Sequence, residues 1–209
     1  MVSQRVHLSA SASVQVTQDM LTMSLSTVRE GSDSQTVQTQ LKTALDTALN
    51  GAKPAARPGL MEVRTGRFGL NPRYDRDGKI TGWRGTAELI LTGRDLALIG
   101  ETAGKVTTMM VSSTQFGLSP EQAQMAQSQA QSQAIEAYRH NATAIAKGFG
   151  YKAYSLVEVN VSNHNEVMIR ERPMMMAKAA MASMADQAVP VEAGLTNVTV
   201  TVSGSVQLQ

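Results

Sequence analysis

The sequence predicts an α+β fold built on a largely antiparallel sheet. Segments at both ends of the chain alternate between apolar and polar residues, which is the period of half-buried strands. Between about 20 and 116 the patterns follow in the order strand, helix, strand, strand, helix, strand, which is typical of the ferredoxin-like βαββαβ arrangement. We expect this unit to be extended by an N-terminal strand, a long alanine-rich helix and C-terminal strands, within a single domain spanning 1–209.

Length and composition agree with a globular protein. The chain has 209 residues, of which 42% are hydrophobic and 17% charged. It contains no cysteine, which excludes disulfides, a thiol nucleophile and zinc–thiolate sites. The net charge of +2 gives no argument for a polyanionic partner. The longest apolar run is far shorter than the roughly 20 residues of a membrane-spanning helix, so no transmembrane segment is expected.

The terminal strands have the clearest pattern. One face of the first strand carries Val6, Leu8, Ala10, Ala12, Val14 and Val16. Gln18-Asp19 interrupts the alternation, which Leu21, Met23 and Leu25 resume, so a hairpin or an antiparallel sheet edge is expected here. The last strand alternates through Val198, Val200, Val202, Val206 and Leu208. We expect the two terminal strands to pair in one sheet.

The first helix is expected to begin at Gly31-Ser32. Ser32 and Gln35 fit a capping box, in which each side chain binds an unpaired backbone N–H group. An apolar stripe follows at helical spacing, formed by Val37, Leu41, Ala44, Leu45, Ala48 and Leu49. Gly51 and Pro54 end the helix.

A long hairpin is expected next, with arms at about 60–69 and 79–92. Asp77-Gly78 is a favourable turn dipeptide. The surrounding segment resembles the middle of an EF-hand loop, but that frame places Arg73 and Arg84 at ligand positions one and twelve, where calcium requires oxygen ligands. The turn is therefore the better interpretation. A short helix (96–106) and a strand (107–116) complete the unit.

The second half of the chain has the clearest helix start, at Ser119-Pro120, with Gln122 completing the capping motif. This helix should run to about Lys147, and its inner face consists of small residues, namely Ala123, Ala126, Ala130, Ala134 and Ala137. A strand through Val157, Val159 and Val161 follows, and then an irregular segment at about 163–194.

No catalytic constellation is evident. His7, His140 and His164 have no ligand spacing, and the sequence has neither a phosphate-binding glycine motif nor a nucleophile elbow. We therefore predict no catalytic residues, no cofactor and no enzymatic activity. An unrecognised hydrolase would require carboxylates, or a serine and a base, brought together in one pocket by the fold.

The segment 57–94 is rich in arginine, with Phe68, Tyr74 and Trp83 interleaved. Basic and aromatic surfaces can bind single-stranded nucleic acid by stacking. A hairpin with a basic outer face and an aromatic inner face gives the same pattern. Nucleic-acid binding is not expected, and exposure of the aromatic side chains would distinguish the two interpretations.

The most unusual segment runs from Met168 to Met184. Thioethers bind Cu(I) and are reversibly oxidised, so Met174, Met175, Met176, Met181 and Met184 could hold copper or scavenge oxidants. Met174, Ala177, Met181 and Met184 also fall at helical spacing, which favours an apolar face packed on the protein or on a neighbouring subunit. Packing or subunit contact is the preferred interpretation, and no metal site is assigned.

After the opening alternating strand, several short pieces follow in a recognisable order: Tyr74-Asp75 leading to Gly82-Trp83-Arg84, Leu91 to Leu96, Phe116 to Ser119, and Pro190 to Gly194. Together these pieces resemble the SIMPL-domain family of bacterial periplasmic or outer-membrane immunogenic and oxidative-stress-defence proteins. The resemblance extends over essentially the whole chain.

This resemblance implies an α+β fold, export to the periplasm or cell envelope, and self-association, without an established enzymatic activity. It also implies a link to envelope or oxidative-stress physiology, and peripheral association with the envelope. Met1-Val2-Ser3 leads directly into a strand with no export signal, so a signal peptide is taken to have been removed or replaced, the alternative being a cytoplasmic protein. The partner that the resemblance implies is a second copy of the chain, in a homo-oligomer.

Overall fold

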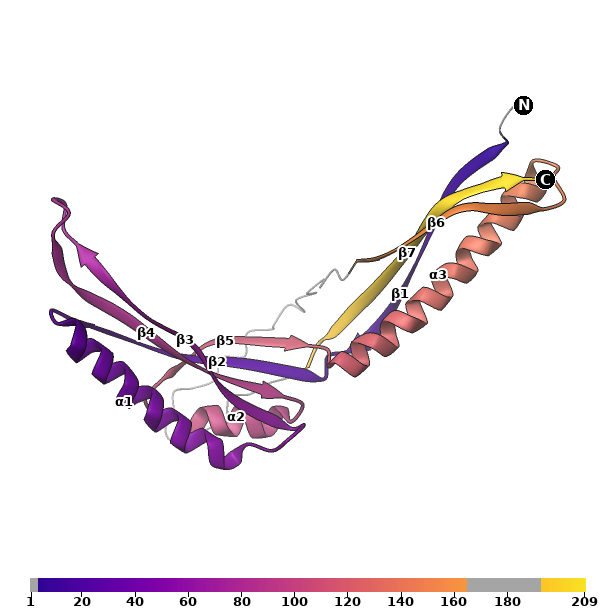
Figure 1. Ribbon diagram of the computed structural model, residues 1–209. Coiled ribbons are helices and arrows are strands. Elements are labelled where there is room, and N and C mark those ends of the chain that lie inside the picture. Colours follow the sequence, from indigo (N-terminus) through magenta and orange to yellow (C-terminus); the bar gives the residue numbers. More distant parts are fainter. Residues whose placement is uncertain (1–3, 165–192) are drawn as a thin grey trace, which may run out of the picture. The chain divides into compact units, whose positions relative to one another are not determined.

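The computed structural model describes residues 4–164 and 193–209, which form two compact units (Figure 1). The central unit contains β2 to β5 with α1 and α2. The terminal unit contains β1, α3, β6 and β7. Both sheets are antiparallel, and the predicted α+β class is confirmed.

The central unit has the predicted order of elements. They are β2 (Met20–Gly31), α1 (Ser34–Ala52), a short 3₁₀ helix (Lys53–Ala55), β3 (Met61–Tyr74), β4 (Ile80–Gly93), α2 (Leu96–Lys105) and β5 (Met110–Gly117). The strands lie in the order β3-β4-β2-β5, so β4 lies between the two strands that α1 connects. Figure 1 shows both helices on the same face of this sheet. Their apolar stripes bury the inward face of β2, including Leu21, Met23 and Leu25.

The predicted cap of α1 was wrong by one residue. The N-cap is Asp33, whose Oδ2 accepts a hydrogen bond from the backbone N–H of Thr36 at 2.7 Å. The predicted capping box of Ser32 and Gln35 is therefore not used. An aspartate at this position binds the same kind of N–H group as a serine, and its negative charge is also favoured by the helix dipole.

The turn between β3 and β4 is confirmed. Asp75 Oδ1 accepts hydrogen bonds from the backbone N–H groups of Asp77 (3.0 Å) and Lys79 (2.8 Å). Gly78 has φ of 76°, a conformation that glycine adopts at no steric cost. The aspartate and glycine of this segment thus hold the turn.

The terminal unit joins the two ends of the chain. β1 (Arg5–Thr17) pairs antiparallel with β7 (Leu195–Leu208) along its whole length, from Arg5 opposite Gln207 to Thr17 opposite Leu195. β6 (Tyr154–His164) pairs with the other edge of β7. The predicted pairing of the terminal strands is confirmed.

Of the two alternatives expected for the first two strands, the hairpin is wrong, because β1 and β2 belong to different sheets, whereas β1 does lie at the edge of an antiparallel sheet. A two-residue hairpin turn requires positive φ, which Asn-Gly or Asp-Gly adopts more readily than Gln18-Asp19. Instead of closing a turn, the N–H of Gln18 donates to the carbonyl of Gly194, and the N–H of Asp19 donates to the carbonyl of Gly117.

The long helix α3 (Pro120–Gly148) begins and ends close to its predicted limits. Ser119 is the N-cap, with its Oγ accepting from the N–H of Gln122 at 3.2 Å, and Gly150 (φ 82°) follows the C-terminus. Its buried residues recur at every fourth position and are Ala126, Ala130, Ala134, Tyr138, Ala142 and Ala146. The predicted inner face was right for the first three, whereas Ala123 and Ala137 are only half-buried.

This four-residue repeat explains the difference. An α-helix has 3.6 residues per turn, so a step of four residues moves about 40° around the axis. The buried stripe therefore winds around α3 as the helix follows the twisted strands β1 and β7, which it contacts. The predicted inner face assumed a stripe that stays at one angle around the helix, and such a stripe turns away from β1 and β7 after a few turns.

Candidate functional site

The terminal unit has one covered and one open face of its sheet. The register places Val6, Leu8 and Ala10 on the face covered by α3, and it places the polar residues that alternate with them on the other. Hydroxyl groups on this open face pair across strands, Ser11 with Thr201 (Oγ to Oγ1, 2.8 Å) and Ser13 with Thr199 (2.7 Å). The open face is therefore a ladder of small hydrogen-bonding side chains.

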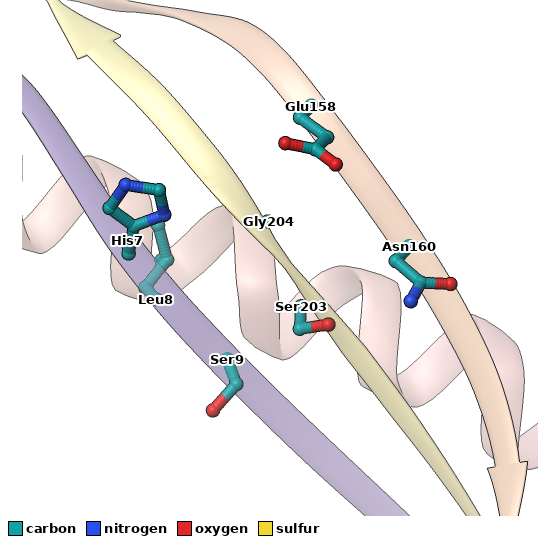
Figure 2. A pocket seen from close by; sticks show the side chains of 7 residues that line it. All are labelled: His7, Leu8, Ser9, Glu158, Asn160, Ser203 and Gly204. Carbon is teal, nitrogen blue, oxygen red and sulfur yellow. The ribbon is translucent and has the colours of Figure 1, made fainter.

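A shallow hollow of about 470 Å³ lies on this open face (Figure 2). It is lined by His7, Leu8, Ser9, Glu158, Asn160, Ser203 and Gly204. Figure 2 shows His7 on one outer strand and Glu158 on the other, on either side of β7. Gly204 is required here, because a Cβ at this position would lie 2.1 Å from the carbonyl oxygen of Glu158. The close approach coincides with the β-bulge between Leu156 and Glu158.

A buried hydroxyl without a partner lies next to the hollow. Ser205 is opposite His7 in β1 and opposite Glu158 in β6, yet it is only 1% exposed and its Oγ has no hydrogen-bond partner. Since His7 does not hydrogen-bond to Ser205, this arrangement lacks the base-to-nucleophile contact of a serine hydrolase. The groups of the hollow can instead donate and accept hydrogen bonds to a polar molecule.

A second feature is a row of exposed apolar side chains on β6. Leu156 is 59% exposed, Val157 45%, Val159 46% and Val161 41%. Leu156, Val159 and Val161 lie opposite Val206, Gly204 and Val202, on the face of the sheet that carries α3. Because α3 packs mainly on β1 and β7, it leaves these side chains uncovered. We call these four residues the β6 apolar row.

The basic hairpin of the central unit has a mixed surface. Glu30 pairs with Arg73 (2.6 Å) and with Arg84 (3.4 Å). Trp83 is half-buried against the core, whereas Phe68 and Tyr74 are exposed. The two exposed aromatic residues are six positions apart on β3, roughly 20 Å along an extended strand, which is too far for stacking of adjacent bases.

The sequence candidates are separated in the structure. His7 lines the hollow and His140 lies on the exposed surface of α3. Met168, Met174, Met175, Met176, Met181 and Met184 lie outside the described residues, so the copper, oxidant and packing interpretations stay predictions. Within residues 4–164 and 193–209, no group of three His, Cys, Asp or Glu side chains could hold a metal ion.

Sequence reasoning missed the grouping of His7 with Glu158, Asn160 and Ser203. These residues come from β1, β6 and β7, and only the register of the sheet brings them together. The available signal was the alternation of polar residues along the two terminal strands. It shows that each strand has a polar face, but it does not show which residues of the two strands lie opposite each other.

The comparisons with known proteins give a family without an assigned activity. Across the part of the chain that the structure describes, no helix is long and apolar enough to span a membrane. No curated protein matches the chain. The family model SIMPL, described as a protein of unknown function (DUF541), matches residues 6–206 and so extends over both compact units. The chain therefore belongs to the SIMPL family.

Proposed function

We propose that this chain is a non-enzymatic, exported protein of the bacterial cell envelope that acts by self-assembly, with a broad link to oxidative-stress physiology. The β6 apolar row is the observation that supports self-assembly most directly. Export and the link to stress are supported by the resemblance to bacterial SIMPL-domain proteins, and the periplasm or the envelope surface is the proposed location.

The β6 apolar row has the properties of a contact surface. Leu156, Val159 and Val161 form an apolar strip on one face of β6, Val157 lies in the bulge beside them, and each of the four is more than two-fifths exposed. Covering such a strip removes apolar surface from water and favours association. The strip is one strand wide, and the residues that alternate with it, Glu158, Asn160 and Ser162, are polar and lie on the opposite face of the sheet. A narrow apolar strip of this kind is better suited to contact another protein than to enter a membrane.

The test is the solution mass of the full chain, measured by light scattering at high micromolar concentration. The wild type is expected to form a defined oligomer. The double variant Val159→Lys/Val161→Lys should give a smaller species, because two charges in the contact carry a desolvation cost. Asn160→Lys, on the opposite face of the same strand, is the matched control and should keep the wild-type mass.

A wild-type chain that stays monomeric at this concentration would refute self-assembly. An oligomer that is unchanged in the double variant would remove the β6 apolar row from the contact. Fractionation of cells that produce the natural precursor tests export separately, and recovery in the cytoplasm would contradict it.

A further inference from the structure

The free edge of β1 has the properties of a pairing surface. β1 contains thirteen residues and pairs with β7 through all of them without a register shift. Within the described ranges, no strand pairs with its other edge. Natural sheets protect such an edge with proline, lysine, bulges or inward charges. β1 has none of these devices, and Arg5, at its first position, is its only Lys, Arg, Asp or Glu.

The other edge of the same sheet is different. β6 contains a bulge between Leu156 and Glu158, and Glu158 lies in the middle of the strand. A bulge bends and twists a strand and interrupts regular pairing. Of the two edges, β1 is therefore the one that can accept a further strand along its whole length.

The apolar face of β1 is nearly the same when read in either direction. If a second β1 is placed antiparallel with Ser11 at the centre, all thirteen residues find a partner. The apolar pairs are then Val6 with Val16, Leu8 with Val14, and Ala10 with Ala12. Large side chains lie opposite large ones and small opposite small, as stable cross-strand pairs require.

The polar face gives the same result. His7 lies opposite Gln15, Ser9 opposite Ser13, and Ser11 opposite itself. Arg5 lies opposite Thr17, so the pairing places no like charges together. A centre shifted by one residue in either direction leaves two residues at one end of β1 unpaired. The whole-length pairing therefore selects Ser11.

We propose that two copies of the chain associate by antiparallel pairing of their β1 edges about a two-fold axis at Ser11. The proposal rests on the self-assembly proposed above and identifies one of its surfaces. It joins the two terminal sheets into one sheet in the order β6-β7-β1-β1-β7-β6. A two-fold axis perpendicular to the sheet keeps both α3 helices on one face and both polar ladders on the other.

The helices leave room for this pairing. α3 contacts both β1 and β7. If its axis runs about midway between them, two copies of α3 are separated by two strand spacings, or about 10 Å. Packed helices lie 8–10 Å apart, so the two helices come into contact without a clash. The β6 apolar row then lies at the two outer edges of the six-stranded sheet, free for contacts beyond a dimer.

The experiment uses cysteine substitution in a chain that has no cysteine of its own. Ser9, Ser11 and Ser13 are all exposed, and Ser→Cys is a small change. Under mild oxidation at dilute concentration, Ser11→Cys should form a covalent dimer. A mixture of Ser9→Cys and Ser13→Cys should form a mixed dimer, which a short affinity tag on one variant identifies.

The controls are the same two variants alone. In the proposed register, Ser9 of each copy is offset by four residues, or about 13 Å, from Ser9 of its partner. A disulfide requires Cα atoms within about 7 Å, so neither variant should cross-link efficiently by itself. The wild type and each variant are also weighed by light scattering before oxidation.

The outcomes separate the two proposals. Cross-linking of Ser11→Cys and of the mixture, at least tenfold above the single-variant controls, supports β1 pairing. An oligomeric mass without this pattern would overturn the β1 pairing and leave self-assembly standing. A monomeric mass with no cross-linking would overturn both. Folding of each variant is checked by circular dichroism.

Discussion

Glu88 in β4 accepts a hydrogen bond from the backbone N–H of Arg67 in β3, with 3.0 Å between Oε2 and N. Arg67 lies where the register of β3 and β4 shifts, between Thr65 and Phe68. A Cβ on Gly66 would collide with the Glu88 side chain, at 2.5 Å from Oε2. The carboxylate therefore replaces a missing ladder partner and closes the bulge.

Glu88→Gln tests this role. The hydrogen bond from the N–H of Arg67 is the main cause that lowers the pKa of Glu88, helped by Ser24 and the charges of Arg67 and Arg64 and opposed by burial. Because the pKa of Glu88 is lower in the folded state, the carboxylate stabilises the folded state at pH values above its ordinary pKa of 4.5. This contribution is lost as the pH falls through the folded-state pKa. We expect the variant to lose about 1 kcal/mol at pH 7. The difference from wild type should shrink as the pH falls through the folded-state pKa of Glu88.

Urea unfolding followed by Trp83 fluorescence is the measurement, because this only tryptophan of the chain lies in the central unit. Glu62→Gln, on β3, is the control and should change stability little. A difference for Glu88→Gln that is independent of pH would contradict the role of the charged carboxylate.

Asp33→Ala should destabilise the central unit measurably, because the N–H of Thr36 loses its acceptor. The hydrogen bonds from Thr36 also lower the pKa of Asp33, so this contribution weakens in acid. Ser32→Ala is the matched control and should have no measurable effect. The free energy of unfolding is again measured in urea by Trp83 fluorescence. An equal decrease in the two variants would favour the capping box of Ser32 and Gln35 that the sequence predicted.

Gly93→Ala should be among the most destabilising single changes in the central unit. A Cβ at Gly93 would lie 2.0 Å from the backbone oxygen of Leu60, which a rotamer change cannot relieve. We expect a loss on the order of 2 kcal/mol or more. Gly69→Ala has no atom within 4 Å of the added Cβ and should change stability by less than about 1 kcal/mol. A similar cost in both variants would show that strand propensity, and not this contact, is responsible.

Tyr138→Phe should not destabilise the terminal unit. Tyr138 is 2% exposed, and its hydroxyl has no hydrogen-bond partner. Burial, and then Tyr154, raises the pKa of this hydroxyl. Removing an unpaired buried polar group is neutral or stabilising, by up to about 1 kcal/mol. Thermal unfolding followed by circular dichroism measures it, and a clear loss of stability would reveal a bound water as the missing partner.

The sequence was most informative where local pattern decides the structure. Alternation over Val6 to Val16 predicted a strand, and Ser119-Pro120 predicted the start of α3, because both signals depend on neighbouring residues. The cap of α1 was misplaced because Ser32 and Asp33 are both good caps, and local signals hardly distinguish them. The division into two sheets depends on which strands pair over long distances, which alternation does not encode.

The candidate site was hardly predictable for the same reason. His7 and Glu158 are separated by about 150 positions and meet only through their shared neighbour Ser205. The exposure of Val159 and Val161 depends on where α3 lies across the sheet, although their presence in a strand was predicted correctly.

The pairing of β1 with β7 also sets an order on folding. Among the described residues the central unit is a continuous stretch, 19–117, and all of its strands are available once that stretch has been made. β1 finds its partner only when β7 has been made, since Ser13 and Thr199, which hydrogen-bond across the two strands, are 186 positions apart. At roughly 5–20 residues per second of synthesis, the first strand waits for about 10–40 s. Until then a nascent chain carries β1 without its partner, although the stretch 19–117 is already complete, and this interval is when a chaperone has most to protect.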